Sequence, residues 1–178
     1  EFGVSLHRAS LALPKIGADI VHTADLKDSL QRRLPYVSLT SEAARREILI
    51  APVVLALLDY TQAQLRIEYS INVSEQLKGT LDYYLHTENS LLIIEAKNAD
   101  LARGFTQLAV ELIALDQWAT SSEPVLYGAV STGDVWQFGR LHREQRRVEQ
   151  DLNLYRVPAD LQELFQILVG LLTSQGHL

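Results

Sequence analysis

The spacing of apolar residues changes along the chain and predicts alternating helices and strands. Apolar residues at helical spacing predict a helix from Ala43 to about Tyr60, with Ser41 as its N-cap. Pro52 lacks a backbone N–H, so it should bend this helix or mark its real start. Nearer the N-terminus the pattern is weak, and we expect only a short helix within 19–34, capped by Thr23 or Asp25.

Three segments after this helix have the pattern of strands. Residues 80–86 alternate between apolar and polar side chains, which is typical of a half-buried strand. Residues 91–97 form an aliphatic run that is long enough for a buried strand and too short for a helix. The polar residues between them predict a hairpin that turns at Glu88 and Asn89. The segment 66–73 alternates too and predicts the first strand, with four inward-facing side chains, Ile67, Tyr69, Ile71 and Val73.

The remaining part of the chain predicts a helix, two strands and a last helix. Asp100 caps a helical pattern over 101–120, and an aliphatic segment at 125–130 predicts a strand. After a turn at 132–134, alternation over 135–141 predicts a fifth strand. Pro158 should begin a final amphipathic helix of about 158–174, whose apolar stripe belongs either to the core or to a homodimer contact. This order predicts an α/β protein with a mixed central sheet of about five strands flanked by helices.

Length and composition are those of one domain, which we expect to span residues 1–178. Of the 178 residues, 47% are hydrophobic, enough for a full core. The chain contains no cysteine, which excludes disulfides and thiolate metal sites. Its net charge of −6 argues against general polyanion binding, so any contact with nucleic acid must come from local basic groups. With no apolar run long enough to span a membrane and no secretory signal pattern, we expect a cytoplasmic protein without membrane contact.

Three charged residues interrupt the predicted hairpin. The turn places Asp82 directly opposite Glu95 on one face, with Cβ atoms roughly 4.5–5.5 Å apart. At an effective dielectric constant of about 20, two carboxylates at that distance repel each other by roughly 3 kcal/mol. Lys97, on the same face, supplies one positive charge, and a hard cation such as Mg²⁺ or Mn²⁺ would supply the rest. The pattern predicts a metal site beside an ammonium group, and the alternative is a structural ion pair with one spare acid.

Asp82, followed after the turn by Glu95-Ala96-Lys97, resembles the motif of the PD-(D/E)XK nuclease superfamily. That family has the restriction-endonuclease-like fold, and the order of predicted elements over roughly residues 41–141 is similar to its core. The resemblance implies that Asp82, Glu95 and the backbone of Ala96 bind the metal and that Lys97 serves the attacking water. Leu81 stands where the motif's name has proline, a position that the family itself varies.

The resemblance extends to one residue on each flanking helix. In part of the family a Glu on the helix before the strands joins the acidic cluster, and helical spacing puts Glu47 on the apolar face, with Arg45 and Arg46 pointing elsewhere. A Gln on the helix after the lysine often contacts the lysine or the water, and Gln107 matches this position. Either residue could instead be an ordinary solvent-facing side chain.

The function that the resemblance implies is hydrolysis of phosphodiester bonds in DNA by an endo- or exodeoxyribonuclease, with Mg²⁺ or Mn²⁺ as cofactor. The alternative is a catalytically silent nuclease-like module for nucleic-acid binding or protein assembly. No G-x-S-x-G elbow, phosphate loop or dinucleotide fingerprint points to another enzyme class. Trp136 and Phe138 are assigned to the core. A basic run is either a phosphate contact or a solvated helix start: Arg140, His142, Arg143, Arg146 and Arg147.

Overall fold

The computed structural model describes residues 3–17, 20, 22–75, 77–88 and 90–173. Within these residues eight strands form one mixed sheet in the order β1-β7-β6-β5-β4-β3-β2, with β8 paired to β6. The β1–β7 and β4–β5 pairs are parallel, and the others are antiparallel. The strands are β1 Ser5–Ala9, β2 Gln64–Asn72, β3 Lys78–His86, β4 Leu91–Ala96, β5 Val125–Ser131, β6 Val135–His142, β7 Arg147–Asp151 and β8 Tyr155–Arg156.

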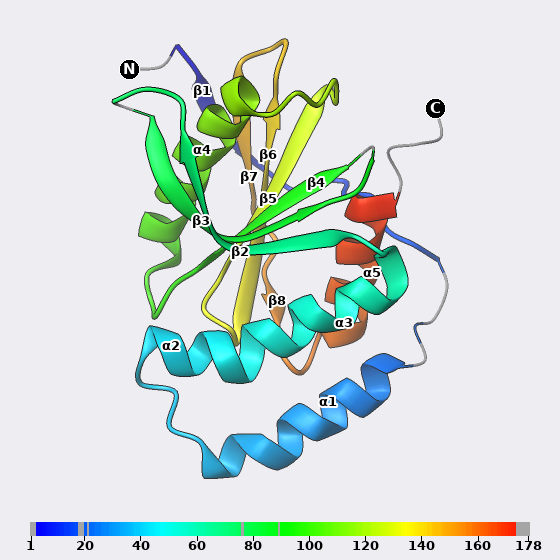
Figure 1. Cartoon of the computed structure of the whole chain (residues 1–178). Coiled ribbons are helices and arrows are strands. Elements are labelled where there is room, and N and C mark those ends of the chain that lie inside the picture. Colours follow the sequence, from blue (N-terminus) through cyan, green and yellow to red (C-terminus); the bar gives the residue numbers. More distant parts are fainter. Residues whose placement is uncertain (1–2, 18–19, 21, 76, 89, 174–178) are drawn as a thin grey trace.

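Helices cover both faces of this sheet (Figure 1). Helix α4 lies on one face and forms the crossover between the parallel strands β4 and β5, while α3 and α5 lie on the other face. The helical elements are α1 His22–Arg33, η1 Leu34–Tyr36, α2 Glu42–Arg45, η2 Arg46–Ile50, α3 Ala51–Thr61, α4 Leu101–Trp118 and α5 Leu161–Thr173. The predicted α/β class with a mixed sheet is confirmed, and the prediction of about five strands is wrong. In the described part of the chain, no helix is long and apolar enough to cross a membrane.

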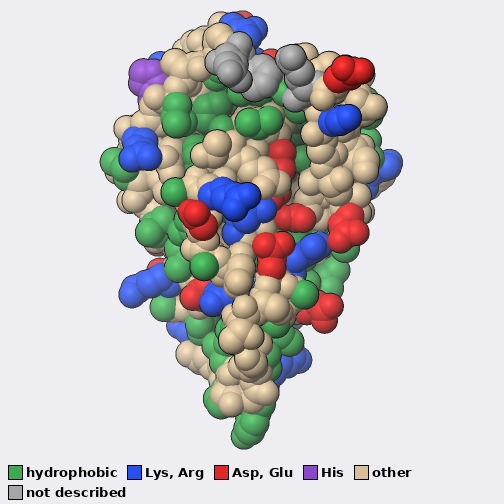
Figure 2. Space-filling model, turned by 90° about the vertical axis from the view of Figure 1, so that its left-hand side faces the viewer, with side chains coloured by type: hydrophobic (Ala, Val, Ile, Leu, Met, Phe, Trp, Pro, Cys, Tyr) green, Lys and Arg blue, Asp and Glu red, His purple; other side chains and the backbone are tan. Residues whose placement is uncertain are grey.

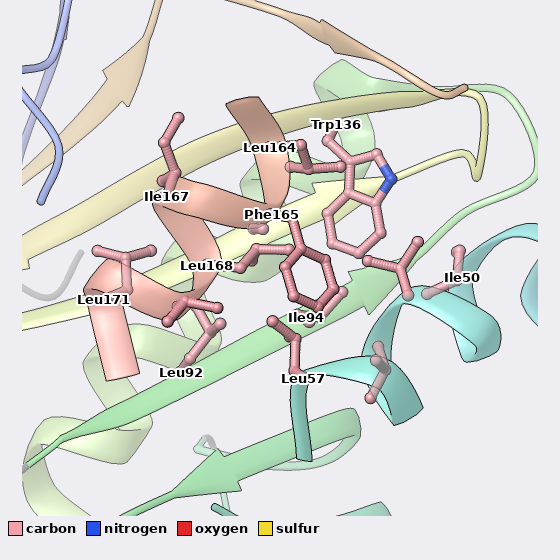
Figure 3. Close-up of a cluster of buried hydrophobic side chains, with 14 of the residues drawn as sticks. Ile50, Leu57, Leu92, Ile94, Trp136, Leu164, Phe165, Ile167, Leu168 and Leu171 are labelled. Atoms are coloured by element: carbon pink, nitrogen blue, oxygen red, sulfur yellow. The ribbon is translucent and has the colours of Figure 1, made fainter. Parts of the chain in front are cut away.

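Two hydrophobic cores lie on the two faces of the sheet. The larger one packs α3 and α5 against the inner strands, with Phe165, Leu57 and Ile94 near Trp136 (Figure 3). Trp136 and Phe138 are fully buried in it, which confirms their assignment to the core. The smaller core lies under α4 and contains Phe105, Leu108 and Leu112. It holds the candidate site, because the charged residues of the hairpin lie on the α4 side of the sheet.

The helix expected from Ala43 to Tyr60 is divided into three segments. Ser41 caps α2, accepting a hydrogen bond from Ala44 N at 3.1 Å, as predicted. The chain then forms the π-helical segment η2 and resumes as α3, with proline in its first turn. Pro52 thus marks the real start of the regular helix, as predicted, and the wider turn before it changes which side chains face the sheet.

Three strands were not predicted, and the basic run belongs to two strands and their turn. β1 is mostly exposed and shows no alternation. Of the two alternatives for the basic run, the helix start is contradicted, because the run spans the end of β6, a turn and the start of β7. All five of its side chains have partners within the chain. Arg140, His142 and Arg147 surround Glu149 at 2.6, 3.0 and 2.9 Å, Arg143 pairs with Asp116 at 2.5 Å, and Arg146 Nε donates to Gly3 O at 3.2 Å.

The other boundaries differ slightly from prediction. The first helix begins at His22, so Thr23 and Asp25 lie in its first turn rather than at its cap. Asp100 caps α4, accepting from Arg103 N at 2.9 Å, but the helix ends at Trp118. The last helix begins at Leu161, after Pro158. The predicted turn at 132–134 is present, with Gly133 at a φ of +89°.

The strands β2 and β3 bend sharply at Glu68 and Asp82. Glu68 has a left-handed φ of 52°, and the pairing register passes over Glu68 and Asp82. On one side of the bend Tyr83 packs into the larger core, and on the other side Leu81 packs into the core under α4. The bend thus reverses the alternation. Its consequence is that Ile67, predicted to face inward, is 55% exposed.

Candidate active site

The hairpin of β3 and β4 has the predicted register and brings Asp82 to Glu95-Ala96. Tyr83 pairs with Ile94 and Tyr84 with Ile93, so Asp82 comes next to Glu95 at the end of the ladder. Asn89, one of the two expected turn residues, lies outside the described residues. Because β3 bends at Asp82, its side chain reaches the neighbouring backbone, and Asp82 Oδ2 accepts a hydrogen bond from Ala96 N at 2.8 Å. Ala96 therefore touches Asp82 through its N–H.

The buried Glu95 forms an ion pair with the half-buried Lys97 beside Asp82. The Glu95 side chain is 1% exposed, and Lys97 Nζ donates a short hydrogen bond to its Oε1. The pKa of Glu95 is raised to about 6, mainly by burial. The hydrogen bond from Lys97 lowers the pKa, and the negative charge of Asp82 raises it. Burial alone would lower the pKa of Lys97, but the hydrogen bond and the charge of Glu95 raise it above its ordinary value. At neutral pH Lys97 is therefore an ammonium group that donates hydrogen bonds.

The position of Lys97 depends on its neighbours in β5 and α4. Its backbone N–H donates to Ser131 O at 2.8 Å, which continues the β4–β5 pairing by one residue. Its aliphatic stem lies against Gly104, where an added Cβ would come within 2.8 Å of Lys97 Cγ. A glycine at this point in α4 lets the lysine stem pass between the helix and the sheet.

A second buried acid, Glu111 on α4, lies beside Glu95 and was not identified from the sequence. Glu111 is 6% exposed. Burial, with a further contribution from the negative charge of Glu95, raises its pKa to about 9. Glu111 is therefore protonated at neutral pH and carries a proton that it can donate. Its place on the buried face of α4, one turn after Gln107, was the only signal that the sequence offered.

The proton of Glu111 accounts for an oxygen that otherwise has no partner. Among the described residues, Glu95 Oε2 is a buried oxygen without a hydrogen-bond donor when both acids are treated as carboxylates. Buried polar atoms without partners are rare in folded proteins. A hydrogen bond between the Glu95 and Glu111 side chains contributes to the pKa shifts of both acids, and the protonated Glu111 is its donor. The carboxylate of Glu95 is thus held from two sides, by Lys97 and by Glu111.

Gln107 contacts the site indirectly, by a hydrogen bond to Glu111. Its Nε2 donates to Glu111 Oε1 at 3.0 Å, which leaves the other oxygen of Glu111 as the one that carries the proton. Gln107 also lines an open cavity of about 420 Å³ beside Lys97, together with Arg103 and Glu42. Larger cavities of about 570 and 710 Å³ lie at the opposite end of β3, around His86 and Thr87.

The structure places Arg46, rather than Glu47, beside Asp82. Glu47 is exposed on the π-helical segment, and the wider π turn rotates it away from the apolar face on which a regular helix would put it. The expectation that Arg46 points elsewhere is wrong as well. Arg46 NH1 lies 3.7 Å from Asp82 Oδ1 and 3.6 Å from Glu68 Oε1, and its guanidinium carbon is 5.5 Å from the centre of the Tyr83 ring.

Acidic and basic side chains gather in the middle of the face formed by α4 and the bent ends of β2 and β3 (Figure 2). Within the described residues, no three His, Cys, Asp or Glu side chains form a group that could hold a metal. Asp82 and Glu95 nevertheless fit a hard cation, since both offer carboxylate oxygens, the ligands that Mg²⁺ and Mn²⁺ prefer. Mg²⁺ is commonly held by one or two carboxylates, with waters and substrate phosphate completing its shell.

No protein-family model, curated protein or solved structure matches this chain. The residues of the site and their contacts are therefore the basis for inferring a function.

Proposed function

We propose that this protein is a divalent-metal-dependent nuclease that hydrolyses phosphodiester bonds in DNA. The observation that carries the proposal is the fully buried Glu95, paired with Lys97 and adjacent to Asp82, at the end of β4. Burying such a group is costly and usually adds little stability, so a role in chemistry accounts for it better than a structural role. The α/β architecture with a mixed sheet supports the proposed restriction-endonuclease-like fold.

Asp82 and Glu95 would hold Mg²⁺ or Mn²⁺, with the backbone of Ala96 next to both acids. The chemistry that such an ion supplies is polarisation of the scissile phosphate and a lower pKa for bound water. Lys97, an ammonium group at neutral pH, donates a hydrogen bond to the attacking water or to the charge that develops on the phosphate. Its pairing with Glu95 fixes the ammonium at that place. Gln107 acts one residue further away, by holding Glu111.

A second candidate function is a catalytically silent nuclease-like module, and one observation favours it. Two cations, Arg46 and Lys97, already face the two ionised acids, so the charges of the site balance without a metal ion. The contact of Arg46 with Asp82 is long, at 3.7 Å, and holds Asp82 only weakly. Displacing Arg46 from Asp82 would therefore cost little. We take the nuclease as the main proposal for this reason.

The test is cleavage of single-stranded, double-stranded and branched DNA with Mg²⁺ or Mn²⁺, using wild type, Asp82→Ala and Lys97→Ala. Asp82→Ala should lose both metal binding and cleavage, because it removes one of two ligands. Lys97→Ala should still bind metal, because it removes a nearby positive charge, but should cut about 10²–10³ times more slowly. Glu47→Ala is the matched control and should behave as wild type, since Glu47 is exposed.

Two results would contradict the proposal. Equal cleavage by wild type and Lys97→Ala would remove Lys97 from the chemistry. A wild type that binds Mg²⁺ or Mn²⁺ and cuts none of these substrates would favour the silent module.

A further inference from the structure

Three aromatic rings and one arginine are stacked along the outer strands β2 and β3. The Tyr69 and Tyr84 rings are nearly parallel, at 12°, and their centres lie 5.3 Å apart. The His86 ring continues the row, 5.2 Å from Tyr84. The guanidinium carbon of Arg66 lies 5.1 Å from the centre of the Tyr69 ring. Stacking and cation–π contacts of this kind hold each side chain in place, so the row presents an ordered π surface.

At His86 this row of rings reaches an open cavity of about 570 Å³ beside the end of α4. Tyr84 and His86 line the cavity together with Trp118, the last residue of α4, which is 42% exposed. Within the described part of the chain, His86 stacks only on Tyr84, and no ring stacks on Trp118. Part of each ring is therefore accessible from the cavity, whose volume is in the range of small-ligand sites.

The other groups that line the cavity suit the edge of a nucleobase and not a phosphate. Five of them are hydroxyl side chains: Thr87, Ser90, Thr120, Ser121 and Ser122. Glu88 and Glu123 add two carboxylates, and among the described residues no lysine or arginine lines the cavity. Carboxylates repel a phosphate, but they accept hydrogen bonds from the N–H groups of bases, and hydroxyl groups both donate and accept. A flat, neutral ring with N–H and C=O groups on its edge matches both kinds of wall.

We propose that the cavity binds an unpaired base of the DNA strand that is cut, stacked on His86 and Trp118, so that the substrate is single-stranded DNA. The inference rests on the proposed function, because it names the class of DNA on which the candidate site acts. In a duplex both faces of each base are already stacked, and turning one out costs free energy. An unpaired base has free faces, and proteins that bind single strands cover them with aromatic side chains.

The cavity lies within reach of the candidate site along one strand of the sheet. His86 follows Asp82 by four residues in β3, which corresponds to about 13 Å at about 3.3 Å per residue. Tyr84, between the two, packs against the core under α4, on the side of the sheet where the site lies. Nucleotides follow one another at about 3.4 Å along a stacked strand. The bound base is therefore within about four nucleotides of the phosphate that is cut.

Tryptophan fluorescence tests the inference, because the chain has only two tryptophans. Trp136 is fully buried and Trp118 lines the cavity, so a base in the cavity should quench Trp118 alone. Wild type is titrated in EDTA, which prevents cleavage, with a single strand of about 12 nucleotides, with the blunt duplex of the same sequence and with deoxyadenosine monophosphate. We expect the single strand to quench Trp118 and to bind at least about tenfold more tightly than the other two.

Four variants separate stacking from other effects, with affinity measured by the fluorescence anisotropy of an end-labelled single strand. Trp118→Leu and His86→Ala should each weaken binding by about 5- to 150-fold, the range for one base stacked on an aromatic side chain. Trp118→Phe keeps a ring and should bind nearly as well as wild type, while its remaining emission, from Trp136, no longer responds to DNA. Tyr36→Ala is the matched control and should behave as wild type, because Tyr36 is an exposed aromatic residue that does not line the cavity.

Three results would overturn the inference. The duplex binds as tightly as the single strand, or the free nucleotide does, or Trp118→Leu and His86→Ala keep wild-type affinity. A free nucleotide that binds as tightly as the strand would make the cavity a nucleotide site unrelated to DNA.

Failure of the proposed function gives a different result, because the binding assay contains no metal. A wild type that cuts no DNA with Mg²⁺ or Mn²⁺, yet binds the single strand and shows quenching of Trp118, overturns the nuclease and supports the cavity as a site for an unpaired base. A wild type that cuts DNA while no single strand quenches Trp118 supports the nuclease and overturns the inference.

Discussion

The buried Glu111 predicts that this protein becomes less stable as the pH rises through the neutral range. In the folded state its pKa is raised to about 9 by burial and by the charge of Glu95, whereas in the unfolded chain it returns to its ordinary value near 4.5. Between these two values the folded protein binds a proton that the unfolded chain has lost. Unfolding therefore releases a proton, and proton release becomes more favourable as the pH rises, so stability falls with rising pH.

The size of the effect follows from the two pKa values. Between pH 6.5 and 8.5 a single group with these values removes about 2.5 kcal/mol from the free energy of unfolding. The loss is complete only when the pH passes through the folded pKa of about 9. Glu95 adds a smaller loss of the same sign at lower pH, because its folded pKa is raised to about 6.

The assay is urea unfolding of wild type and Glu111→Gln at several pH values from 6.5 to 8.5, without metal. Glutamine keeps the shape of the side chain and cannot titrate, so the variant should lose most of the pH dependence that wild type shows. The difference in unfolding free energy between the two proteins should change by about 2.5 kcal/mol over this range. Parallel curves for the two proteins would refute the reasoning, since Glu111 would then not be a buried, protonated acid.

Three other substitutions test the structure around the site. Gly104→Ala places a Cβ 2.5 Å from Val130 Cγ2 and 2.8 Å from Lys97 Cγ. We expect this variant to lose about 1–3 kcal/mol of unfolding free energy in urea and to cleave DNA more slowly. Wild-type values for both would show that α4 does not confine the lysine stem. Glu68→Gly relieves a left-handed residue and should raise the melting temperature by an amount equivalent to about 1 kcal/mol, and a lower melting temperature would mean that the bend is not strained. Asp151→Ala removes the acceptor of Leu11 N at 3.1 Å and should cost about 1–3 kcal/mol, measured by urea unfolding; a neutral result would show that β1 does not depend on it.

The sequence predicts the middle of this fold well and its edges poorly. The strands β3 to β6 and the helices α4 and α5 have strong periodicity because they are buried on one or both faces. β1 is mostly exposed, so its sequence carries little pattern. The sequence leaves the charged turn between β6 and β7 open between a phosphate contact and a helix start, because the ion pairs of Arg140 with Glu149 and of Arg143 with Asp116 join residues that are distant along the chain.

The candidate site was predicted as far as its local spacing allowed. Asp82, Glu95 and Lys97 lie on one hairpin, whose register follows from the turn, and the structure brings them together as expected. The prediction for Glu47 assumed a regular helix. The π-helical segment changes which side chain faces the site, so that Arg46 lies beside Asp82 in place of Glu47. The residues next to Glu111 in the sequence do not identify it as a site residue. It belongs to the site because it interacts with Glu95 on β4, and this contact between helix and sheet forms only in the folded protein.

The bend at Glu68 and Asp82 also determines which parts of the molecule can open together. Because it sends Ile71 and Leu81 to the α4 side, the outer ends of β2 and β3 close around that helix and share its core. Partial opening of the protein would then release α4 with these strand ends as one unit, while α3 and α5 keep the other core intact. Every charged group that we assign to the site lies in or next to this unit. Amide hydrogen exchange should therefore report on the integrity of the site well before the whole chain unfolds.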